Sequence, residues 1–463
     1  MLTGVKYRAY PTKEQAQILS QWMGCARVVW NGKCDETHYY NTFARKYLPI
    51  GEWAPINATY AQFKHPELTP WLSECPCQIL RNSVTTWYDT YQKFMKRKCG
   101  KPKKKKKIKG SSIYLTSELF TFKLCKDGNL RLFIGTKTNN IGFLAFKAHR
   151  KFEIPKSIRI KTKNRRFFVS FCYEDGLNIE DFESKKARQT ILDNLRSLGE
   201  TALEKCIAGG DRGCIIPLRV NSTSFDYTKR QKINKRKYER KYKNQQRKLA
   251  RGVKGSNHGK KTKYRIAKYH EDIRNIRVDF AHKTSHAVVS NPEIKIMIFE
   301  DLKIRNMLRR PKVKKDENGK FLKNNAKVKA ALSKMIADAA WYNIACFTTY
   351  KALRAGKYVF KISPYQTSQE CAECGHIHPG NRVSQGVFIC KRCHVVKNAD
   401  ENASQVLRKR ALKLILNSGT ELSEKWVLAP PILTDKGRGA ERKTLGVEAF
   451  NAVSYEASKK KVA

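Results

Sequence analysis

Four cysteines arranged as two CxxC pairs constrain the fold of this chain more than any other feature of its sequence. Cys371 and Cys374 form the first pair, and Cys390 and Cys393 form the second after fifteen intervening residues. Each pair can supply two thiolates to one tetrahedral Zn²⁺ ion, and a site filled by four thiolates has no open position for catalysis. The spacing therefore predicts one structural zinc ion in a ribbon over residues 365–395. A histidine in place of one cysteine is the alternative, since three lie close by: His376, His378 and His394.

Three carboxylates stand at the ends of predicted elements that are far apart in the sequence. Asp211 follows a short apolar run and two glycines, which allow close backbone approach at that point. Glu300 follows the apolar run 294–299, which is typical of a buried strand. Asp400 stands in the opening turn of an amphipathic helix. Because ligands of α/β sheets bind beyond the carboxyl ends of the strands, the three acids could converge there.

Convergent carboxylates of this kind suit phosphodiester hydrolysis by two divalent cations. Two Mg²⁺ ions, or Mn²⁺, held about 4 Å apart need several hard anionic oxygens from separate elements. Each acid alone also has a simpler explanation. Asp400 could cap its helix, and Glu300 with Asp301 could end a strand at the solvent. The order strand-Asp, strand-Glu, helix-Asp favours the metal site, while the spacing alone leaves both interpretations open.

The charge of the chain points to a polyanionic partner. Its 463 residues include 94 Lys and Arg against 40 Asp and Glu, a formal net charge of +54. Nucleic acid is the usual polyanion that offsets such repulsion, with a basic membrane-surface or ribosomal-type protein as the alternative. No apolar run approaches the roughly 20 residues of a membrane span, and the first residues lack a secretion signal. We therefore expect no membrane association, and a cytoplasmic, nucleoid-associated location in a prokaryote or a nuclear one in a eukaryote.

A basic helical hairpin is predicted over residues 229–288. Apolar residues spaced three and four apart from Ile266 to Phe280 form its seam, and the stretch from Gly252 to Gly259 breaks the two helices. The functional interpretation of its first helix is a backbone clamp on a nucleic-acid duplex, and the alternative is a solvated face. The cations that we select as nucleic-acid contacts on this helix are Lys229, Arg230, Lys232, Arg236, Arg240 and Lys243.

Several segments resemble the TnpB (OrfB) family, the transposon-encoded relatives of type V CRISPR effectors. The opening YRAYPTKEQ and MGCARVVWN resembles the N-terminus of that family, and WLSECPCQILRNSV resembles its next helix. IFEDLKIRNM is similar to the second nuclease motif. IADAAWYNI and YKALRAGKYVFKISPYQTSQECAECGH resemble the entry to the zinc ribbon, and FICKRCHVVKNADENAS its exit into the third motif. The resemblance covers most of residues 1–415 and is densest at 295–307 and 335–410.

The resemblance implies an α/β multi-domain RNA-guided DNA endonuclease. Asp211, Glu300 and Asp400 would be the catalytic triad of an RNase H-like RuvC nuclease that is interrupted by the four-cysteine ribbon. An oligonucleotide-binding-like β-barrel with a helical recognition insert would precede it. The partners would be a guide RNA from the transposon end, on which the chain acts as a monomer, and a DNA target beside a short flanking motif. The helix around Arg81 and Asn82 would lie near that flanking duplex.

The sequence also departs from the family pattern, which keeps two other functions open. Asn398 and Ala399 precede Asp400 where the family usually has an Asp-Arg pair, and Gly210 precedes Asp211 where an apolar residue is usual. A missing basic residue beside the metals would slow cleavage. The alternatives are a catalytically weak RNA-guided repressor that only binds DNA, and an RNase H-fold transposase that acts without RNA.

The composition and the resemblance together predict the domain boundaries. Alternating segments separated by Gly, Asn and Asp turns indicate a small antiparallel β unit after residue 110, and Gly, Pro, Glu and Lys accumulate without period near the C-terminus. The predicted division is a β-barrel at 1–11 and 110–178, a helical insert at 12–109, a linker at 179–204, the nuclease at 205–364 and 396–416, the ribbon at 365–395 and a flexible tail at 417–463.

Overall fold

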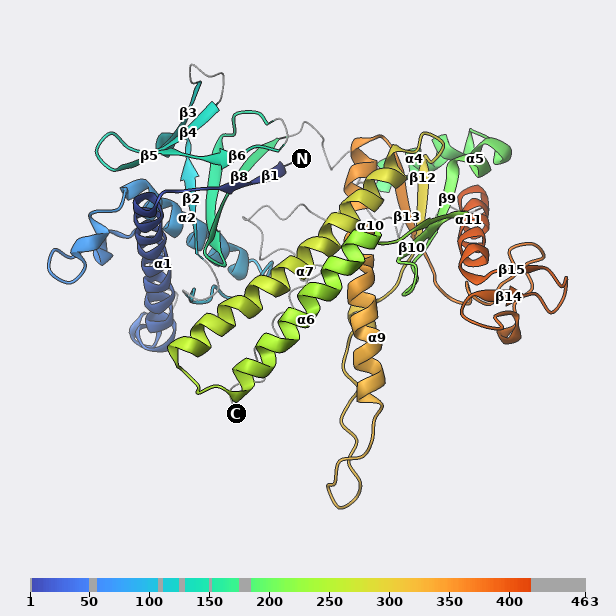
Figure 1. Cartoon of the computed structure of the whole chain (residues 1–463). Helices are drawn as coiled ribbons and strands as arrows, with labels where there is room; N and C mark the ends of the chain where they lie inside the picture. Colours follow the sequence, from blue (N-terminus) through green and yellow to red (C-terminus); the bar gives the residue numbers. More distant parts are fainter. Residues whose placement is uncertain are drawn as a thin grey trace. The chain divides into compact units, whose positions relative to one another are not determined.

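The computed structural model describes residues 2–49, 56–106, 111–124, 130–149, 152–174 and 185–417. It is a mixed α/β protein with two compact units, which consist of the described residues up to 174 and those from 185 onward (Figure 1). The predicted tail at 417–463 lies outside the described residues apart from Asn417. No helix in the described ranges is both long and apolar enough to cross a membrane.

The first unit is built from two antiparallel sheets and two main helices. Its sheets have the strand orders β2-β7-β8-β1-β6 and β3-β4-β5. The alternation expected for residues 1–10 and 112–175 is therefore present as strands. The strands are β1 (Leu2–Ala9), β2 (Ser112–Thr116), β3 (Phe120–Leu124), β4 (Leu130–Gly135), β5 (Asn140–Leu144), β6 (Phe146–Lys147), β7 (Ser157–Lys163) and β8 (Arg166–Glu174). The helices are α1 (Lys13–Thr42) and α2 (Cys77–Met95).

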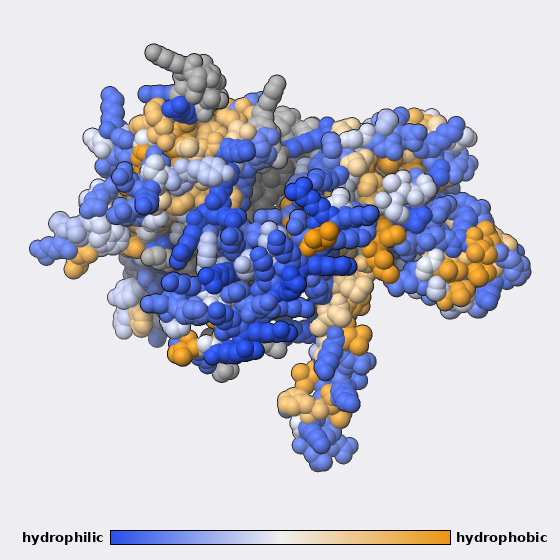
Figure 2. All heavy atoms as spheres, viewed as in Figure 1, coloured by the Kyte–Doolittle hydropathy of each residue, from blue (hydrophilic) through white to orange (hydrophobic). Residues whose placement is uncertain are grey.

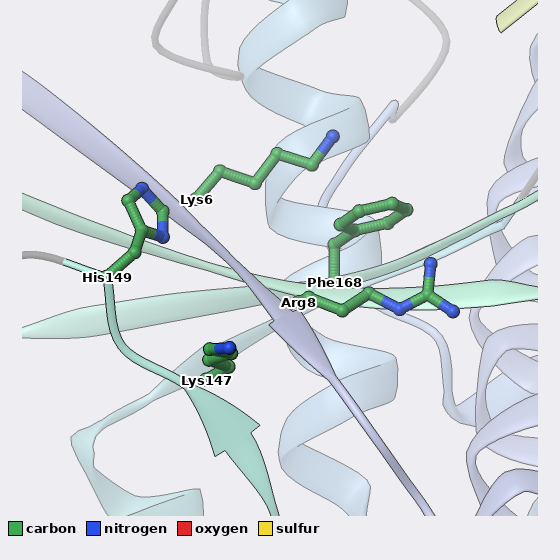
Figure 3. A pocket seen from close by; sticks show the side chains of 5 residues that line it. All are labelled: Lys6, Arg8, Lys147, His149 and Phe168. Atoms are coloured by element: carbon green, nitrogen blue, oxygen red, sulfur yellow. The ribbon is translucent and has the colours of Figure 1, made fainter. Parts of the chain in front are cut away.

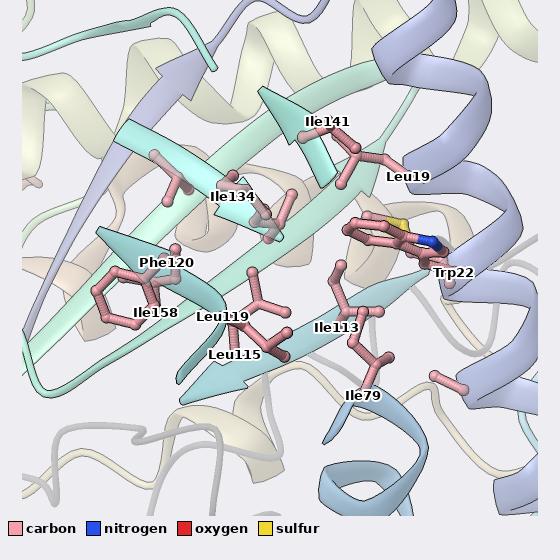
Figure 4. Close-up of a cluster of buried hydrophobic side chains, with 14 of the residues drawn as sticks. Leu19, Trp22, Ile79, Ile113, Leu115, Leu119, Phe120, Ile134, Ile141 and Ile158 are labelled. Atoms are coloured by element: carbon pink, nitrogen blue, oxygen red, sulfur yellow. The ribbon is translucent and has the colours of Figure 1, made fainter. Parts of the chain in front are cut away.

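One hydrophobic core joins the sheets and helices of the first unit (Figure 4). Thr12 begins α1 with a capping box, because its hydroxyl accepts the Gln15 amide while the Gln15 side chain accepts the Thr12 amide. Trp22 of α1 and Ile79 of α2 are buried against residues of the strands, among them Ile113. Burying these large apolar side chains is the main force that holds the helices against the sheets.

The second unit has one five-stranded mixed sheet with helices on it. The strand order is β11-β10-β9-β12-β13, in which β9, β12 and β13 are parallel and β10 and β11 are antiparallel. The strands are β9 (Ile207–Asp211), β10 (Leu218–Val220), β11 (Thr223–Phe225), β12 (Ile296–Glu300) and β13 (Tyr358–Ile362). The main helices are α6 (Lys229–Arg251), α7 (Asn257–Ser290), α9 (Ala326–Ala339), α10 (Trp341–Arg354) and α11 (Ala399–Asn417). Between β13 and α11 lies the short hairpin of β14 (Val387–Ile389) and β15 (Val396–Asn398).

Residues 185–204, which the sequence suggested as part of a linker, form helices that pack into the second unit. They comprise α4 (Lys185–Arg196) and most of α5 (Glu200–Cys206). Leu192, Leu195 and Leu203 are buried in one cluster with Ile207 of β9. Most residues of this segment are polar, so its apolar stripe consists of only a few leucines. These leucines are enough to pack two short helices against the sheet.

The predicted hairpin of α6 and α7 is present, but its seam is only partly a core. The two helices pack side by side, and the Tyr238 ring stacks on the Tyr269 ring at a centroid distance of 6.3 Å (Figure 1). Ile273 and Phe280 of α7 are buried, whereas α6 has no buried residue. α10 packs against α7 and shares a buried cluster with Phe280, whereas Ile266, Tyr269 and Ile276 of the seam stay half-buried.

Candidate active site and metal centre

Asp211 and Glu300 are the last residues of two adjacent parallel strands. The register pairs Gly210 of β9 with Phe299 of β12, and each strand ends one residue later with an acid. Neighbouring strands lie about 4.8 Å apart, so the two acids are held side by side at the carboxyl edge of the sheet. Asp211 is half-buried and the side chain of Glu300 is 8% exposed. The sequence-based placement of both acids at strand ends is therefore present in the structure.

The two glycines before Asp211 lie within β9, and each faces an obstacle. A Cβ at Gly209 would lie 2.0 Å from the Ser404 carbonyl oxygen of α11, and one at Gly210 would lie 2.3 Å from Cε of Met297. The Ser404 hydroxyl also donates to the Gly209 carbonyl at 2.8 Å. A larger residue at position 209 would push α11 away from β9, whereas one at position 210 would displace the side chains of Met297 and Phe299. Gly209 therefore lets α11, which carries Asp400, approach the end of β9.

Asp400 lies in the first turn of α11, and a neighbouring residue caps that helix. The Asn398 side-chain oxygen accepts the amides of Asp400 and Glu401 at 3.1 and 3.3 Å. This leaves the Asp400 carboxylate, which is 19% exposed, for other contacts. A Cβ at Gly213 would lie 3.7 Å from Asp400 Oδ2, so this carboxylate sits beside the chain that follows Asp211. The capping explanation that the sequence left open applies to Asn398 instead.

Three residues that sequence reasoning missed hold the acids in place. The Thr367 hydroxyl donates to Glu300 Oε1 at 2.6 Å, and the buried Arg212 guanidinium donates to the Glu300 carbonyl. Arg382 Nη2 lies 3.5 Å from Asp400 Oδ1. Only Arg212 carried a signal, since it directly follows Asp211. Thr367 and Arg382 contact the acids from loops beside the cysteines. No local sequence pattern predicts these two contacts.

The electrostatics of the acid cluster oppose full ionisation without a cation. Burial raises the pKa of Asp211 to about 7, with further contributions from the charges of Glu300 and Asp400, while Arg382 acts to lower it. Burial lowers the pKa of the Arg212 guanidinium. Crowded carboxylates at a sheet edge resist a third negative charge unless a cation shares them. Hard oxygen donors with excess negative charge are what a divalent ion such as Mg²⁺ prefers.

The four cysteines converge on one point, as their spacing predicted. Among the described residues they are the only group of three or more potential ligands whose donor atoms all lie within 4.8 Å of one another. Two sulfur pairs, Cys371 with Cys393 and Cys374 with Cys390, lie 3.6 Å apart. A tetrahedral zinc with bonds of about 2.3 Å separates its sulfurs by about 3.8 Å, so the cluster fits a metal ion of this kind.

The backbone around each CxxC pair favours metal binding. The residue after each pair, Gly375 or His394, has a positive φ of 72° or 56° that turns the chain back over the sulfurs. Burial acts to raise the pKa of the Cys390 thiol, but the amides of Cys393 and Arg392 and its neighbouring thiols lower it to about 6. A thiolate is the form that binds metal. No histidine belongs to the described cluster, so the alternative of a histidine ligand finds no support.

The six cations selected on α6 are all exposed, and the helix forms a strongly hydrophilic surface (Figure 2). Lys232 pairs with Asp226, while Lys235 pairs with Asp338 of α9 at 3.1 Å. The other charges of the predicted set lie on one continuous helix. Such a surface can follow a phosphate backbone.

The two residues selected on α2 have structural partners in the first unit. Arg81 pairs with Glu118 at 2.8 Å. Asn82 is only 8% exposed, and its side chain donates to the Tyr114 carbonyl of β2 at 3.2 Å. The buried amide of Asn82 is thus used to attach α2 to the sheet, whereas the half-exposed Arg81 side chain retains access to solvent.

Three family profiles match parts of this chain. The profile described as "Cas12f1-like, TNB domain" matches residues 341–407, which include all four cysteines and Asp400. The profile "Probable transposase" (OrfB_IS605) matches 214–310, which includes Glu300. A "Helix-turn-helix domain" profile of the same OrfB group matches 1–35, although the described part of that segment consists of strand β1 and the start of the single helix α1.

Curated relatives match this chain either over most of its length or over a short part of it. A protein of Escherichia coli (strain K12) named RNA-guided DNA endonuclease InsQ is 26% identical over 406 residues, 87% of this chain and 91% of that protein. The CRISPR-associated endodeoxyribonuclease Cas12f1 of Sulfoacidibacillus thermotolerans is 42% identical over 73 residues, 16% of this chain and 17% of that protein. A cryo-EM structure of a Cas12f1-sgRNA-target DNA complex covers 86% of this chain and 83% of its own at 13% identity, with a TM-score of 0.47.

Fold and site define a class: an α/β protein with a carboxylate cluster at a sheet edge and a four-cysteine cluster that could hold a metal ion in the same unit. Within that class the chain is similar to the OrfB_IS605 profile over residues 214–310 and to the Cas12f1-like profile over residues 341–407. Its curated relatives include proteins named as RNA-guided DNA endonucleases and as Cas12f1.

Proposed function

We propose that this chain is an RNA-guided DNA endonuclease that binds a guide RNA and hydrolyses phosphodiesters of a matching DNA target beside a short flanking motif. The observation that carries the proposal is the juxtaposition of Asp211, Glu300 and Asp400, which come from β9, β12 and α11. The 26% identity to a named RNA-guided DNA endonuclease over 87% of the chain supports the same activity. The net charge of +54 supports two nucleic-acid partners.

In this proposal the three acids are the oxygen ligands of the active site. Two divalent ions, Mg²⁺ or Mn²⁺, would supply an activated water and stabilise the leaving 3′-oxygen. Thr367 orients the Glu300 carboxylate, and Arg212 fixes the backbone of Glu300 from the buried side. Arg382 places a guanidinium beside Asp400, where it can also attract a phosphate oxygen. This cation compensates for the basic residue that is missing before Asp400.

The finer architecture is also a proposal. We assign an RNase H-like RuvC fold to residues 205–364 and 396–416 and a structural zinc ribbon to 365–395. A shared core beneath the two sheets supports an oligonucleotide-binding-like barrel at 1–11 and 110–178 with a helical recognition insert at 12–109. Residues 185–204 of the predicted linker at 179–204 pack as helices in the second unit. We expect one copy of the chain on each guide RNA.

The exposed cations of α6 would contact the backbone of the guide–target duplex. Arg240→Ala and Lys243→Ala should each weaken duplex binding a few-fold and reduce the slope of log affinity against log salt by about 1. A matched control is Lys283→Ala on α7, whose charge pairs with Asp279. An unchanged slope in the α6 variants would remove this helix from the interface.

The decisive experiment is to purify the chain with its RNA, sequence that RNA and assay cleavage of DNA that matches its 3′ end with and without Mg²⁺. Discrete RNA and Mg²⁺-dependent cleavage are expected. Protein without discrete RNA would favour a transposase acting alone. Protein with RNA whose DNA-dependent effects survive Asp211→Ala would favour a repressor. The capping role of Asn398 and the position of Arg382 weaken that second case, because the departure that suggested it has a structural cause.

A further inference from the structure

A basic hollow that contains an aromatic ring lies on the five-stranded sheet of the first unit. It has a volume of about 310 Å³ (Figure 3). Its lining contains three cations, one imidazole and one aromatic ring, with no acid: Lys6, Arg8, Lys147, His149 and Phe168. The mechanism proposed for the second unit uses none of these residues.

The strand register places these side chains in one row across the sheet. Arg8 of β1 pairs with Lys147 of β6 on one side and with Phe168 of β8 on the other. Phe168 in turn pairs with Lys161 of β7. Directly paired residues share a face of the sheet, so Phe168 has a cation on either flank. In the next row on the same face, Ser170 lies between Lys6 and Arg159.

The opposite face of the same strands is the hydrophobic core. Tyr7 and Val169 pair with each other and are fully buried, as is Ile160. Phe168 alternates with these residues and is therefore turned outward, with the Lys6 ammonium 4.0 Å and the Arg8 guanidinium 5.2 Å from its ring centroid. An outward phenylalanine among cations contributes nothing to the core. Its position calls for a ligand with a flat face and negative charge.

We propose that this hollow binds an unpaired nucleotide of the guide RNA, with its base stacked on Phe168 and its flanking phosphates against Arg8, Lys147 and Lys161. The inference rests on the proposed function for the identity of the RNA. Antiparallel sheets bind unpaired RNA in this way, through an aromatic ring for the base and cations for the backbone. Stacking on a base is stronger than an exposed cation–π contact, so a base displaces the Lys6 ammonium from the ring.

A duplex does not satisfy this geometry, because its base faces are covered by neighbouring pairs. The ligand must therefore come from a loop, a bulge or an end. RNA is favoured over a displaced DNA strand because the Ser170 hydroxyl, between two cations and one position along β8 on the same face, can donate to or accept from a 2′-hydroxyl. Unpaired RNA segments are also the part of a folded guide that proteins read through stacking.

The test uses the full chain with its co-purified RNA and probes base reactivity with dimethyl sulfate and carbodiimide. At least one unpaired guide nucleotide should be protected in the wild type and should become as reactive in Phe168→Leu as in free RNA. Tyr47→Leu is the matched control, because Tyr47 is an aromatic residue of the same unit that is 86% exposed and outside the hollow. Binding of a ten-nucleotide oligouridylate to RNA-free protein should weaken about tenfold in Phe168→Leu.

A second measurement needs no variant. Ultraviolet crosslinking of the wild-type complex, followed by mass spectrometry, should recover an RNA-linked peptide that contains Phe168. The absence of both the crosslink and the change in protection would overturn the proposal. Protection that moves to the displaced DNA strand would overturn the RNA assignment. A complex that fails to cut DNA but crosslinks at Phe168 would overturn the proposed nuclease and support this site, and the two hypotheses are thereby separated.

Discussion

The four cysteine sulfurs lie within 4.8 Å of one another and come from one short segment, whereas Asp211, Glu300 and Asp400 are brought together from three separate elements of the same unit. All four sulfurs come from one stretch of 23 residues, Cys371 to Cys393. Each carboxylate comes from a different element and repels the other two. The cysteine cluster, a local site, can form from its own short segment. The carboxylate cluster, a distributed site, depends on packing between β9, β12 and α11.

The two sites are nevertheless connected by the chain. Thr367 and Arg382 belong to the segments that lead into and through the cysteine cluster, and they contact Glu300 and Asp400. The Asn402 side chain of α11 also accepts the Ala372 amide at 2.9 Å. A four-cysteine zinc site has no open coordination position, so it can act as a rigid support. Side chains of the surrounding segment, here Thr367 and Arg382, can then be held against a neighbouring carboxylate site. Substitutions in the carboxylate cluster or in the cysteine cluster can test how far the two sites depend on each other.

The largest expected effect is the loss of cleavage in Asp211→Asn. The substitution keeps the shape of the side chain but removes a metal-binding charge, so cleavage should fall by at least about a thousandfold. Target binding by the RNA-loaded protein should persist, which a gel-shift assay would measure beside the cleavage assay. Asp301→Asn is the control, because this neighbouring acid pairs with Lys303 instead of the cluster. Equal cleavage by Asp211→Asn and wild type would exclude this acid from catalysis.

Cys390→Ser should abolish the metal content of the cysteine cluster. One zinc per chain is expected in the wild type and none in the variant, because a three-sulfur site with a poor fourth ligand loses several kcal/mol of binding energy. Cleavage should then fall about a hundredfold, since Thr367 and Arg382 lose their support. Cys77→Ser, at an exposed cysteine outside the cluster, should change neither quantity. Elemental analysis and the cleavage assay measure both. Full cleavage by a zinc-free variant would show that the two sites are independent.

The sequence predicted the local site better than the distributed one, for a physical reason. The cysteine spacing specifies its own geometry, because two short turns bring the sulfurs together without help from elsewhere. Asp211 and Glu300 could be placed at strand ends from apolar runs and glycines. The contacts of Thr367 and Arg382 could not, because they depend on how two distant loops pack. The segment 176–204 was predicted as a polar linker with one amphipathic helix, and the second of its two helices was missed because a few leucines give little apolar periodicity.

Arg382→Ala tests the link between the two sites. Removal of the guanidinium beside Asp400 should lower cleavage about thirtyfold, which is less than the loss of a donor that contacts the transition state directly. Zinc content should stay at one per chain. Arg382→Lys should restore part of the activity, because it keeps the charge without the planar geometry. Arg392→Ala is the matched control, an exposed arginine between the two cysteines of the second pair. Equal losses in both arginine variants would indicate a general loss of charge and not a specific contact with Asp400.

The last effect concerns the free energy of unfolding in place of the cleavage rate, and it follows from the raised pKa of Asp211. Burial, with Glu300 and Asp400, raises this pKa to about 7, above the roughly 3.9 of an unfolded aspartate. The folded protein therefore keeps a proton that the unfolded chain has already released, so its stability falls as the pH rises from about 4 and levels off above 7. Asparagine cannot ionise and avoids this loss.

Metal-free Asp211→Asn should accordingly be more stable than metal-free wild type, by about 4 kcal/mol at pH 8 and about 1.5 kcal/mol at pH 5. Urea unfolding at the two pH values measures the difference. Added Mg²⁺ should reduce the difference in free energy of unfolding between the two proteins, because a cation bound to the folded carboxylates stabilises the wild type. If the difference in free energy of unfolding were the same at both pH values, Asp211 would stay ionised in the folded state. The carboxylate cluster would then carry no electrostatic strain that distinguishes it from the cysteine cluster.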